Sequence, residues 1–390
     1  MSSEVEPPSA VPSEMDRVVR ERYSAAAQNR EAALCCPVDY DAKYLRIIPA
    51  EVIGRDYGCG DPSRYVHEGD AVLDLGSGGG KICFIASQIV GPKGSVVGVD
   101  TNDEMLELAR RSTSAIADEL GYGNVHFMRG QIQDLALDHD KLGDWLSSHP
   151  IQDAGGLLLL EAEKDRLRRS SPMVPDESVD IVLSNCVLNL VHDDHKPQLI
   201  REIFRVLKRG GRIAISDIVS DEFVPNELRA DPDLWSGCIS GAFEEGELLR
   251  ELESVGFYGI TIDKWEQEPF AVVEGIEFRS VTVTATKGKE GLCWEGNRAV
   301  IYRGPWKRVE DDDGHTLERG QRVAVCDKTY EILTAGSYAS ETVGILPRVK
   351  IPDANRKSFD CTRFVTREPR ESKGQDYHET HESCNTEGCC

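Results

Sequence analysis

The chain of 390 residues lacks the long apolar stretches that a membrane span requires. Its longest apolar run, residues 155–160, lies between charged residues. The N-terminal segment also lacks the apolar centre of a signal peptide, and residues 1–15, rich in Ser, Pro and Glu, are expected to be disordered. These absences predict a cytoplasmic protein without a membrane partner.

Positive charge is scarce. The chain has 45 Lys and Arg against 68 Asp and Glu, a net charge of −23. Such a surface repels the phosphates of nucleic acids and anionic membranes, so nucleic acid is excluded as an expected partner. The apolar fraction of 40% is that of an ordinary globular protein, which leaves a small molecule or another protein as the partner.

The twelve cysteines include no Cys-x-x-Cys pair, which argues against a zinc ribbon. In a reducing compartment they are expected to be thiols rather than a disulfide framework. Two pairs are adjacent in the sequence, Cys35-Cys36 and Cys389-Cys390. Adjacent cysteines pack poorly, and exposed pairs suit thiophilic ligands or redox chemistry.

Strand and helix patterns alternate through most of the chain. After a predicted helix over residues 18–33, we expect strands at 71–75, 95–99, 125–128, 179–184, 212–216, 258–263 and 279–286. The predicted helices between them are 81–89, 103–116 with Asp103 as its cap, 198–208 ended by Gly210-Gly211, and 244–254. This order predicts an α/β fold with a doubly wound, mostly parallel sheet in a domain over residues 16–288.

Two parts depart from this alternation. A helical insertion over residues 137–175 is longer than a compact connection requires, and a lid, an interface and a decoration all remain open for it. After residue 288 the pattern changes to a small β-rich appendage over 289–346 and a polar tail over 347–390 that ends in cysteines. Short strands are expected in the appendage at 300–304, 308–309, 321–326 and 330–333.

A glycine-rich loop, Asp74-Leu-Gly-Ser-Gly-Gly-Gly80, follows the first strand and opens a helix. Glycines let the backbone approach a ligand, and the helix start offers free N–H groups. Asp100 ends the next strand, where it can accept two ribose hydroxyls, and residues 130–134 end the third strand, where an adenine would rest. The loop lacks the Gly-x-Gly-x-x-Gly spacing of dinucleotide sites and resembles that of class I S-adenosylmethionine-dependent methyltransferases.

This resemblance implies a set of contacts to S-adenosylmethionine. Gln133 stands where many relatives carry an acid, which departs from the usual adenine contact. The implied cofactor-binding residues are Tyr57, Asp74, Gly76, Ser77, Gly78, Gly80, Asp100, Thr101, Met105, Gln131, Ile132 and Asn185.

Three cysteine motifs point to the substrate. They are Tyr57-Gly-Cys-Gly, Ser184-Asn-Cys-Val-Leu-Asn-Leu and Trp235-Ser-Gly-Cys-Ile-Ser-Gly-Ala. Together they resemble the arsenite methyltransferase family over residues 23–287. Trivalent arsenic is soft and binds three thiolates in a trigonal pyramid with its lone pair free.

The resemblance implies that Cys186 and Cys238 are the core arsenic ligands, and that Cys59 completes the site or forms a disulfide during the reaction. Either Cys35 or Cys36 corresponds to a further N-terminal catalytic cysteine of the family. The implied substrate is arsenite or methylarsenite, and turnover requires an external thiol reductant of the thioredoxin or glutathione type. No general base is assigned, although His192, His195 and Asp217 lie near predicted strand ends.

Other readings stay open. The chain could methylate another soft or small substrate, such as selenium, tellurium or an organic thiol, or bind metalloids without turnover. The appendage cysteines, with those of the tail, could capture arsenite or simply pack. A structural metal is open there, although the spacing is not that of a zinc motif; these residues are Cys293, Cys326, Cys361, Cys384, Cys389 and Cys390.

Overall fold

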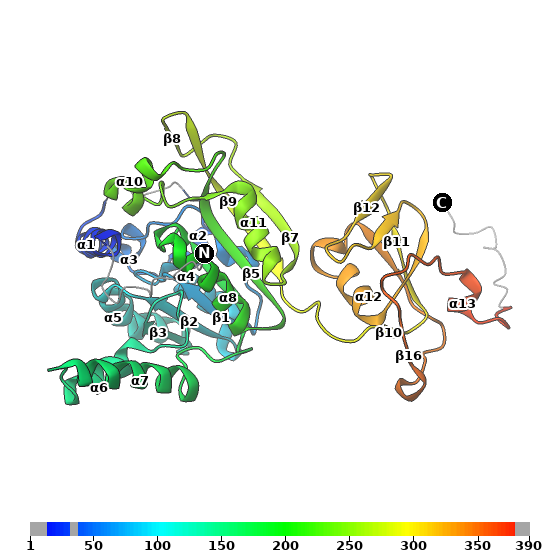
Figure 1. Ribbon diagram of the computed structural model, residues 1–390, viewed down its shortest axis with the longest axis horizontal. Helices are drawn as coiled ribbons and strands as arrows, with labels where there is room; N and C mark the ends of the chain where they lie inside the picture. The colour runs from blue at the N-terminus through cyan, green and yellow to red at the C-terminus, as the bar shows by residue number, and fades with distance from the viewer. Residues whose placement is uncertain (1–13, 32–37, 379–390) are drawn as a thin grey trace, which may run out of the picture. The chain divides into compact units, whose positions relative to one another are not determined.

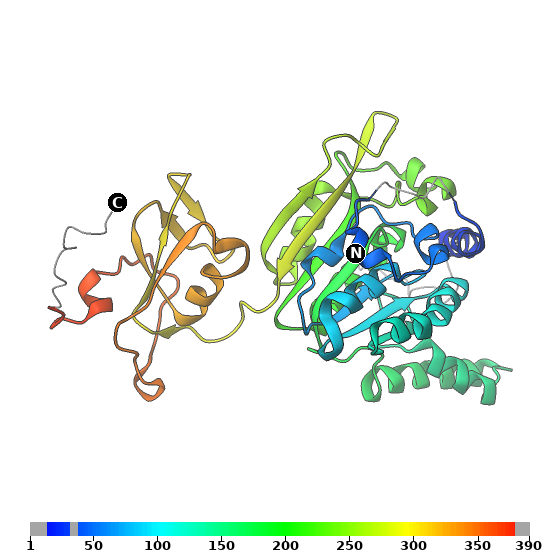
Figure 2. The ribbon, with the colours of Figure 1, turned by 180° about the vertical axis from the view of Figure 1, so that it is seen from behind.

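The computed structural model describes residues 14–31 and 38–378. The chain divides into two compact units, the first ending at Gly288 and the second beginning at Lys289 (Figures 1 and 2). The predicted N-terminal thiols, Cys35 and Cys36, and the three tail cysteines lie outside the described residues.

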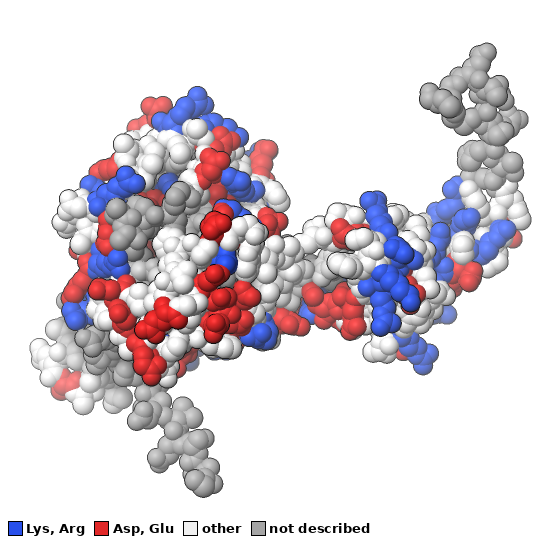
Figure 3. All heavy atoms as spheres, turned by 90° about the horizontal axis from the view of Figure 1, so that it is seen from above, with Lys and Arg blue, Asp and Glu red and all other residues white. Residues whose placement is uncertain are grey.

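Acidic charge is concentrated in the first unit. Residues 289–390 carry 16 Lys and Arg against 18 Asp and Glu, so the rest of the chain holds 21 of the 23 excess negative charges. Figure 3 shows acidic side chains gathered on one face of the first unit, whereas the second unit displays a band of basic side chains. The repulsion of nucleic-acid phosphate expected from net charge therefore applies mainly to the first unit.

A nine-stranded sheet forms the centre of the first unit, in the order β3-β2-β1-β4-β5-β9-β7. Two short strands lie off this path, β6 on β5 and β8 on β9. The strands are β1 Ala71–Leu75, β2 Ser95–Asp100, β3 Val125–Arg129, β4 Val179–Asn185, β5 Leu207–Ser220, β6 Phe243–Glu244, β7 Tyr258–Trp265, β8 Ala271–Val273 and β9 Ile276–Thr286.

The sheet is mostly parallel and is covered on both faces. The neighbours from β3 to β5 pair in parallel, whereas β9 runs antiparallel to β5 and β7. Alternate side chains enter two separate cores: Val72 and Ile181 pack with α4 (Lys81–Val90) and α5 (Asp103–Leu120), while Leu73 and Val182 pack with α8 (Lys196–Val206) and α11 (Glu245–Ser254). The doubly wound α/β fold is confirmed.

The predicted cap of α5 was one residue off. Asn102, not Asp103, is the cap, because its side-chain oxygen accepts the N–H of Met105 at 3.0 Å. Asp103 is instead the first helical residue and pairs with Arg129 at 3.0 Å. The side-chain amide of Asn102 is left to donate to the hydroxyl of Ser24 in the N-terminal helix.

The predicted helix over 198–208 was wrong at its end. The helix α8 stops at Val206, and β5 begins at Leu207, which pairs with Val179. The two glycines do not end the helix; they lie in an irregularity of β5, where Gly210 has a φ of 79° and donates its N–H to the carbonyl of Lys287 at 2.7 Å. Pairing with neighbouring strands overrides the local helical pattern here.

The insertion forms a helical hairpin of α6 (His139–Ser148) and α7 (Ala154–Ser170). Its helices share a small apolar core of their own, centred on Leu142 and Leu167. The hairpin closes at its base, where Met173 and Val174 donate backbone N–H groups to residues 136 and 135 at 3.0 and 2.9 Å. In the part of the chain that the structure describes, no helix is both long and apolar enough to cross a membrane.

The second unit is built on a three-stranded antiparallel sheet, β14-β11-β15, with two small two-stranded ladders. Val300, Tyr302, Val323 and Leu333 form its core. Its elements are β10 Trp294–Glu295, β11 Arg298–Tyr302, β12 Arg308–Glu310, β13 Thr316–Glu318, β14 Arg322–Val325, α12 Asp327–Leu333, β15 Thr342–Ile345, β16 Lys357–Ser358 and α13 Pro369–Lys373.

One expectation for this unit was wrong: the segment 330–333 is not a strand but the end of α12, a helix capped by the sulfur of Cys326. The described part of the polar segment beyond residue 347 packs on the sheet: Arg367 is 6% exposed and donates its backbone N–H to the carbonyl of Arg322 in β14 at 2.9 Å. This segment therefore contributes to the folded unit.

Candidate active site

The glycine loop between β1 and α4 approaches the end of β4 closely. Gly76, Gly78 and Gly80 have φ angles of 64°, 49° and 89°, which favour glycine. A Cβ added at Gly76 would lie 2.4 Å from Cγ2 of Val187. The loop that was predicted to hold the cofactor therefore lies against the residue that follows Cys186.

Two buried carboxylates flank this loop. Asp100, at the end of β2, accepts the N–H groups of Gly78 and Asn102, both at 2.8 Å, and burial raises its pKa. Asp74, inside β1, accepts the thiol of Cys83 at 3.1 Å. Burial raises the pKa of Asp74 to about 7, so a cationic ligand nearby would stabilise its ionised form.

The residues of this region fit S-adenosylmethionine. The buried hydroxyl of Ser77 has no hydrogen-bond partner within the described residues, as expected of a group that awaits a ligand. The glycines leave room for backbone contacts, and the first turn of α4 presents N–H groups. Asp74 and Asp100 suit the cationic and hydroxyl groups of such a cofactor.

The three cysteines of the predicted arsenic site come together. Cys59, Cys186 and Cys238 are each at most 6% exposed and share one apolar cluster with Ile218 and Phe278. Cys59 and Cys186 form a disulfide with a Cα–Cα distance of 5.9 Å. The thiol of Cys238 donates to the carbonyl of Cys186 at 3.2 Å. Both Cys186 and Cys238 have positive φ angles, 57° and 63°, a backbone state that is costly outside glycine and clusters at functional sites.

Asn185 positions the loop that carries Cys59. Its side-chain oxygen accepts the N–H groups of Cys59 and Gly60 at 2.9 and 3.1 Å, and its amide donates to the carbonyl of Gly60 at 2.9 Å. A Cβ added at Gly58 would lie 2.0 Å from the Asn185 amide nitrogen. We predicted Asn185 as a cofactor ligand; the contacts present in the structure are to the Cys59 loop.

Asn189 joins the motifs of Cys186 and Cys238. Its side-chain amide donates to the carbonyls of Ile218 and Cys238 at 2.7 and 3.2 Å. The backbone of the Cys238 motif approaches so closely that a Cβ added at Gly241 would lie 2.1 Å from the carbonyl oxygen of Asn189. The Asn and Gly positions of the two sequence motifs are therefore a matched contact that brings the two cysteines together.

Asp217 is a site residue to which the sequence assigned no role. One of its carboxylate oxygens lies within 4.8 Å of the sulfurs of Cys59 and Cys186. It accepts the N–H groups of Leu188 and Ile218 at 2.9 and 2.8 Å, and burial raises its pKa to about 6. In the sequence, only its position at the end of a predicted strand pointed to the site. The pairing of β4 with β5 brings it close to the two sulfurs.

The N-terminal helix α1 (Glu14–Gln28) reaches both halves of the site, which sequence reasoning missed. The hydroxyl of Tyr23 lies 3.6 Å from the sulfur of Cys238. On the cofactor side, the Asn102 amide donates to the hydroxyl of Ser24 at 3.0 Å. Tyr57, predicted to contact the cofactor, donates its hydroxyl to the carbonyl of Ala26 at 2.9 Å.

The remaining predicted cofactor residues line the ends of β2 and β3. Thr101 and Gln131 are exposed, whereas Met105 and Ile132 are buried. The ends of these two strands are joined at Asp100, whose carbonyl accepts the N–H of residue 130 at 3.0 Å. Contact of these four residues with the cofactor stays a prediction.

The fold and the loop together define the class of the protein. A doubly wound sheet with a glycine loop after β1 and a carboxylate at the end of β2 is the arrangement of a class I S-adenosylmethionine-dependent methyltransferase. A family model described as "Methyltransferase domain" matches residues 66–155 and 162–256, and a model for a domain of unknown function matches residues 289–377.

Known proteins narrow the class to a family. The chain is 30% identical to an arsenite methyltransferase of Aquipseudomonas alcaligenes, over 83% of this chain and 89% of that protein, and 32% identical to the human arsenite methyltransferase, over 76% and 72%. The crystal structure of an arsenic(III) S-adenosylmethionine methyltransferase from Chlamydomonas reinhardtii is similar with a TM-score of 0.53 and 27% identity, covering 83% of this chain and all of that one. The chain belongs to the arsenite methyltransferase family.

Proposed function

We propose that this enzyme transfers the methyl group of S-adenosylmethionine to trivalent arsenic held by cysteine thiolates. Arsenite is held by Cys59, Cys186 and Cys238, and methylarsenite, which has two exchangeable hydroxyls, is held by two of them. One observation carries the proposal: these three buried cysteines share a cluster beside a loop suited to S-adenosylmethionine. A nitrogen or oxygen nucleophile needs a side chain, such as a glutamate or histidine, to remove its proton. The lone pair of trivalent arsenic carries no proton and needs no such residue.

Substrate binding requires the reduced enzyme. Once the Cys59–Cys186 disulfide is reduced, three thiols exchange with the three hydroxyls of arsenous acid and release three molecules of water. The product is a neutral arsenic trithiolate, which an apolar cluster tolerates better than an ion. Asn185 and Asn189 hold the cysteine loops in place and so orient the arsenic lone pair.

When bound, S-adenosylmethionine supplies a methyl carbon on a positively charged sulfur. The cysteine cluster places the nucleophile and excludes water, and Gly76 allows the cofactor loop to lie against the Cys186 segment. Asp217 acts as a positioning residue by holding the backbone after Cys186. No proton leaves the arsenic, so no general base is assigned.

Electrons balance through the cysteines. Methyl transfer converts arsenic from the trivalent to the pentavalent state, and formation of the Cys59–Cys186 disulfide returns two electrons to it. The arsenic then holds only the methyl group and Cys238, and two molecules of water supply the two hydroxyls of the trivalent methylated product. One of the displaced hydrogens returns to the thiol of Cys238 and the other leaves as a proton. An external dithiol or two thiols, of the thioredoxin or glutathione type, then reduce the disulfide, a requirement that fits the reducing cytoplasm.

Product analysis tests this function. The enzyme is incubated with arsenite, S-adenosylmethionine and excess thiol, and arsenic species are separated with elemental detection. Methylated arsenic is expected from the wild type and is expected to be lost in Cys186→Ser, while binding of S-adenosylmethionine by calorimetry persists. Cofactor binding without methylated arsenic in the wild type would move the substrate to another soft atom, which selenite or an organic thiol would identify.

A further inference from the structure

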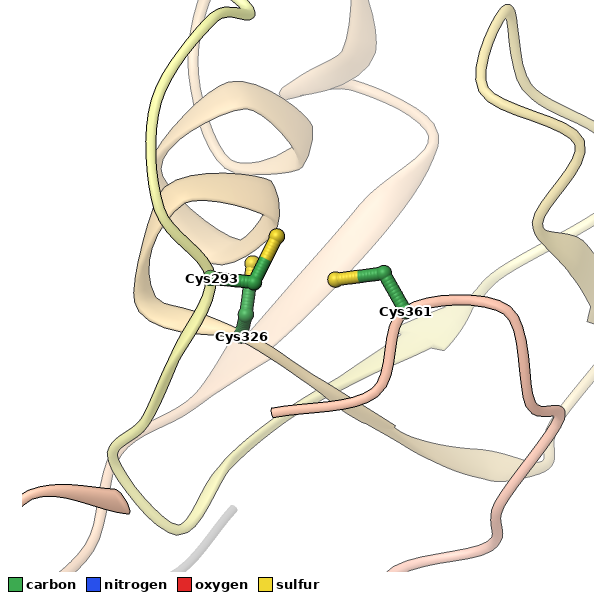
Figure 4. Close-up of side chains that lie close together, drawn as sticks. All are labelled: Cys293, Cys326 and Cys361. Atoms are coloured by element: carbon green, nitrogen blue, oxygen red, sulfur yellow. The ribbon is translucent and has the colours of Figure 1, made fainter. Parts of the chain in front are cut away.

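Three cysteines of the second unit lie far apart in the sequence, but their sulfur atoms are close together in the structure. The sulfurs of Cys293, Cys326 and Cys361 all lie within 4.8 Å of one another. Figure 4 shows that Cys361 points from its own loop toward the other two. All three are thiols, and burial together with the two neighbouring thiols raises the pKa of Cys361.

The backbone holds the three segments in register. Cys293 precedes β10, which pairs with β16, and its carbonyl accepts the N–H of Phe359 at 2.9 Å. Beyond Cys361, the N–H of Ala324 in β14 donates to the carbonyl of Val365 at 2.7 Å. The loop of Cys361 is therefore tied on one side to the Cys293 segment and on the other to the strand that leads into Cys326.

Cys326 is the most buried of the three. It is fully buried and caps α12, with its sulfur accepting the N–H of Thr329 at 3.3 Å. The hydroxyl of Thr329 lies 3.2 Å from the same sulfur. The sulfur of Cys326 is thus held in place by the N–H and the hydroxyl of Thr329. The two thiols that face it are partly exposed, so the three sulfurs form a binding site with one open side.

The number and charge of the ligands select the occupant. Within the described ranges the group consists of three sulfurs and no fourth ligand atom, whereas structural zinc takes four. The nearest acid in sequence, Asp327, is already engaged by Arg298 at 2.9 Å and Arg356 at 3.0 Å. A trithiolate of a divalent ion would carry a net negative charge into a partly buried site, but that of trivalent arsenic is neutral.

We propose that Cys293, Cys326 and Cys361 form a second binding site for trivalent arsenic, separate from the methylation site. Arsenous acid exchanges its three hydroxyls for the three thiolates; three As–S bonds form, three As–O bonds break, and the thiol hydrogens leave in three molecules of water. No atom is oxidised or reduced. Sulfurs bound to one centre at about 2.3 Å lie less than about 4 Å apart, so small side-chain rotations close the site.

The test measures arsenic bound to the full chain without turnover. The background is Cys186→Ser/Cys238→Ser, which removes the methylation ligands, so the result does not depend on whether arsenic is methylated. The protein is dialysed against arsenite with a phosphine reductant, and arsenic per chain is measured. We expect one arsenic per chain in the background and at least a tenfold loss of affinity when Cys361→Ser is added.

The matched control adds Cys384→Ser/Cys389→Ser/Cys390→Ser to the same background and is expected to leave one arsenic bound. Because Cys361→Ser could disturb folding, arsenic X-ray absorption on the background chain provides a second measurement, with three sulfur neighbours and no oxygen expected. Loss of arsenic only with the tail variant would overturn the proposal. Oxygen in the arsenic shell, or stoichiometric zinc that arsenite does not displace, would do the same.

Discussion

Two buried acids define the site at the scale of single residues, and they play different parts. Asp100 is surrounded by N–H donors from the glycine loop and the start of α5. Asp74 has the thiol of Cys83 as its hydrogen-bond partner and a pKa of about 7. The sequence predicted both near the cofactor, but only the structure shows how deeply each is buried and that burial raises the pKa of both.

Asp100→Asn is expected to weaken the loop and the cofactor site together. Hydrogen bonds to a charged acceptor are worth about 2 kcal/mol, so the free energy of unfolding should fall by about that amount and the affinity for S-adenosylmethionine at least about tenfold. Urea unfolding and calorimetry measure both. Asp103→Asn is the control: its exposed pair with Arg129 should matter by less than about 0.5 kcal/mol, and equal effects in the two variants would contradict the assigned role.

Asp74 predicts a pH dependence of stability in the absence of cofactor. Its folded pKa of about 7 lies above that of an unfolded aspartate, so its contribution is fully present below the unfolded value and is lost as the pH rises through 7. Wild type should lose on the order of 3 kcal/mol more stability than Asp74→Asn between pH 5 and pH 8. Comparing the two proteins cancels the contributions of the other titrating groups. If urea unfolding gives the same dependence of stability on pH for both proteins, the pKa of Asp74 is not raised in the folded state.

At the scale of elements, the site is a junction of loops at the ends of β1, β4 and β5. The matched contact of Asn189 with the Cys238 motif brings two cysteines together, and Asn185 sets the third. The helix α1 then links α5 to α10 (Pro232–Ser236), because Arg22 donates to the carbonyl of Asp233 at 3.0 Å. Each cysteine is therefore held by a side chain from another element.

Gly241→Ala tests this junction. The added Cβ would overlap the carbonyl of Asn189 at 2.1 Å, so backbone must move, at a cost of about 1–3 kcal/mol, and Cys238 moves with it. Loss of most arsenite methylation is expected, with binding of S-adenosylmethionine retained. In the control Gly143→Ala the new Cβ meets no atom within 4 Å inside α6, and stability should rise by up to about 1 kcal/mol. Full methylation activity in Gly241→Ala would exclude the contact as a determinant of the site.

At the scale of the whole molecule, the two units have separate cores. A ligand that binds one native unit stabilises that unit alone. S-adenosylmethionine at 100 times its dissociation constant should therefore stabilise the first unit by about 2.7 kcal/mol and leave the second unchanged.

Calorimetry with and without the cofactor checks this expectation, and tryptophan fluorescence assigns the two transitions. Three tryptophans lie in the first unit and two in the second: Trp145, Trp235 and Trp265, then Trp294 and Trp306. A Trp294→Phe/Trp306→Phe variant reports on the first unit alone. An equal shift of both transitions would show that the units unfold as one.

The sequence by itself determined the sheet, the helices that cover it and the place of the cofactor loop. Buried parallel strands, amphipathic helices and glycine turns each depend on the pattern of a few neighbouring residues. For this reason the bounds of β1 were predicted to the residue. Where pairing between distant segments competes with a local pattern, as at Gly210 in β5, the local prediction failed. At the segment 330–333 the predicted strand is instead the end of a short helix, whose cap at Cys326 the apolar pattern did not reveal.

Only the tertiary structure decided which side chains meet. The disulfide between Cys59 and Cys186, the approach of Asp217 to these sulfurs and the contact of Asn189 with the Cys238 motif depend on strand register and loop closure. The same holds for the three thiols of the second unit, whose spacing in the sequence matches no motif. Their convergence follows from the β10–β16 pairing and the end of β14, long-range contacts that no local pattern encodes.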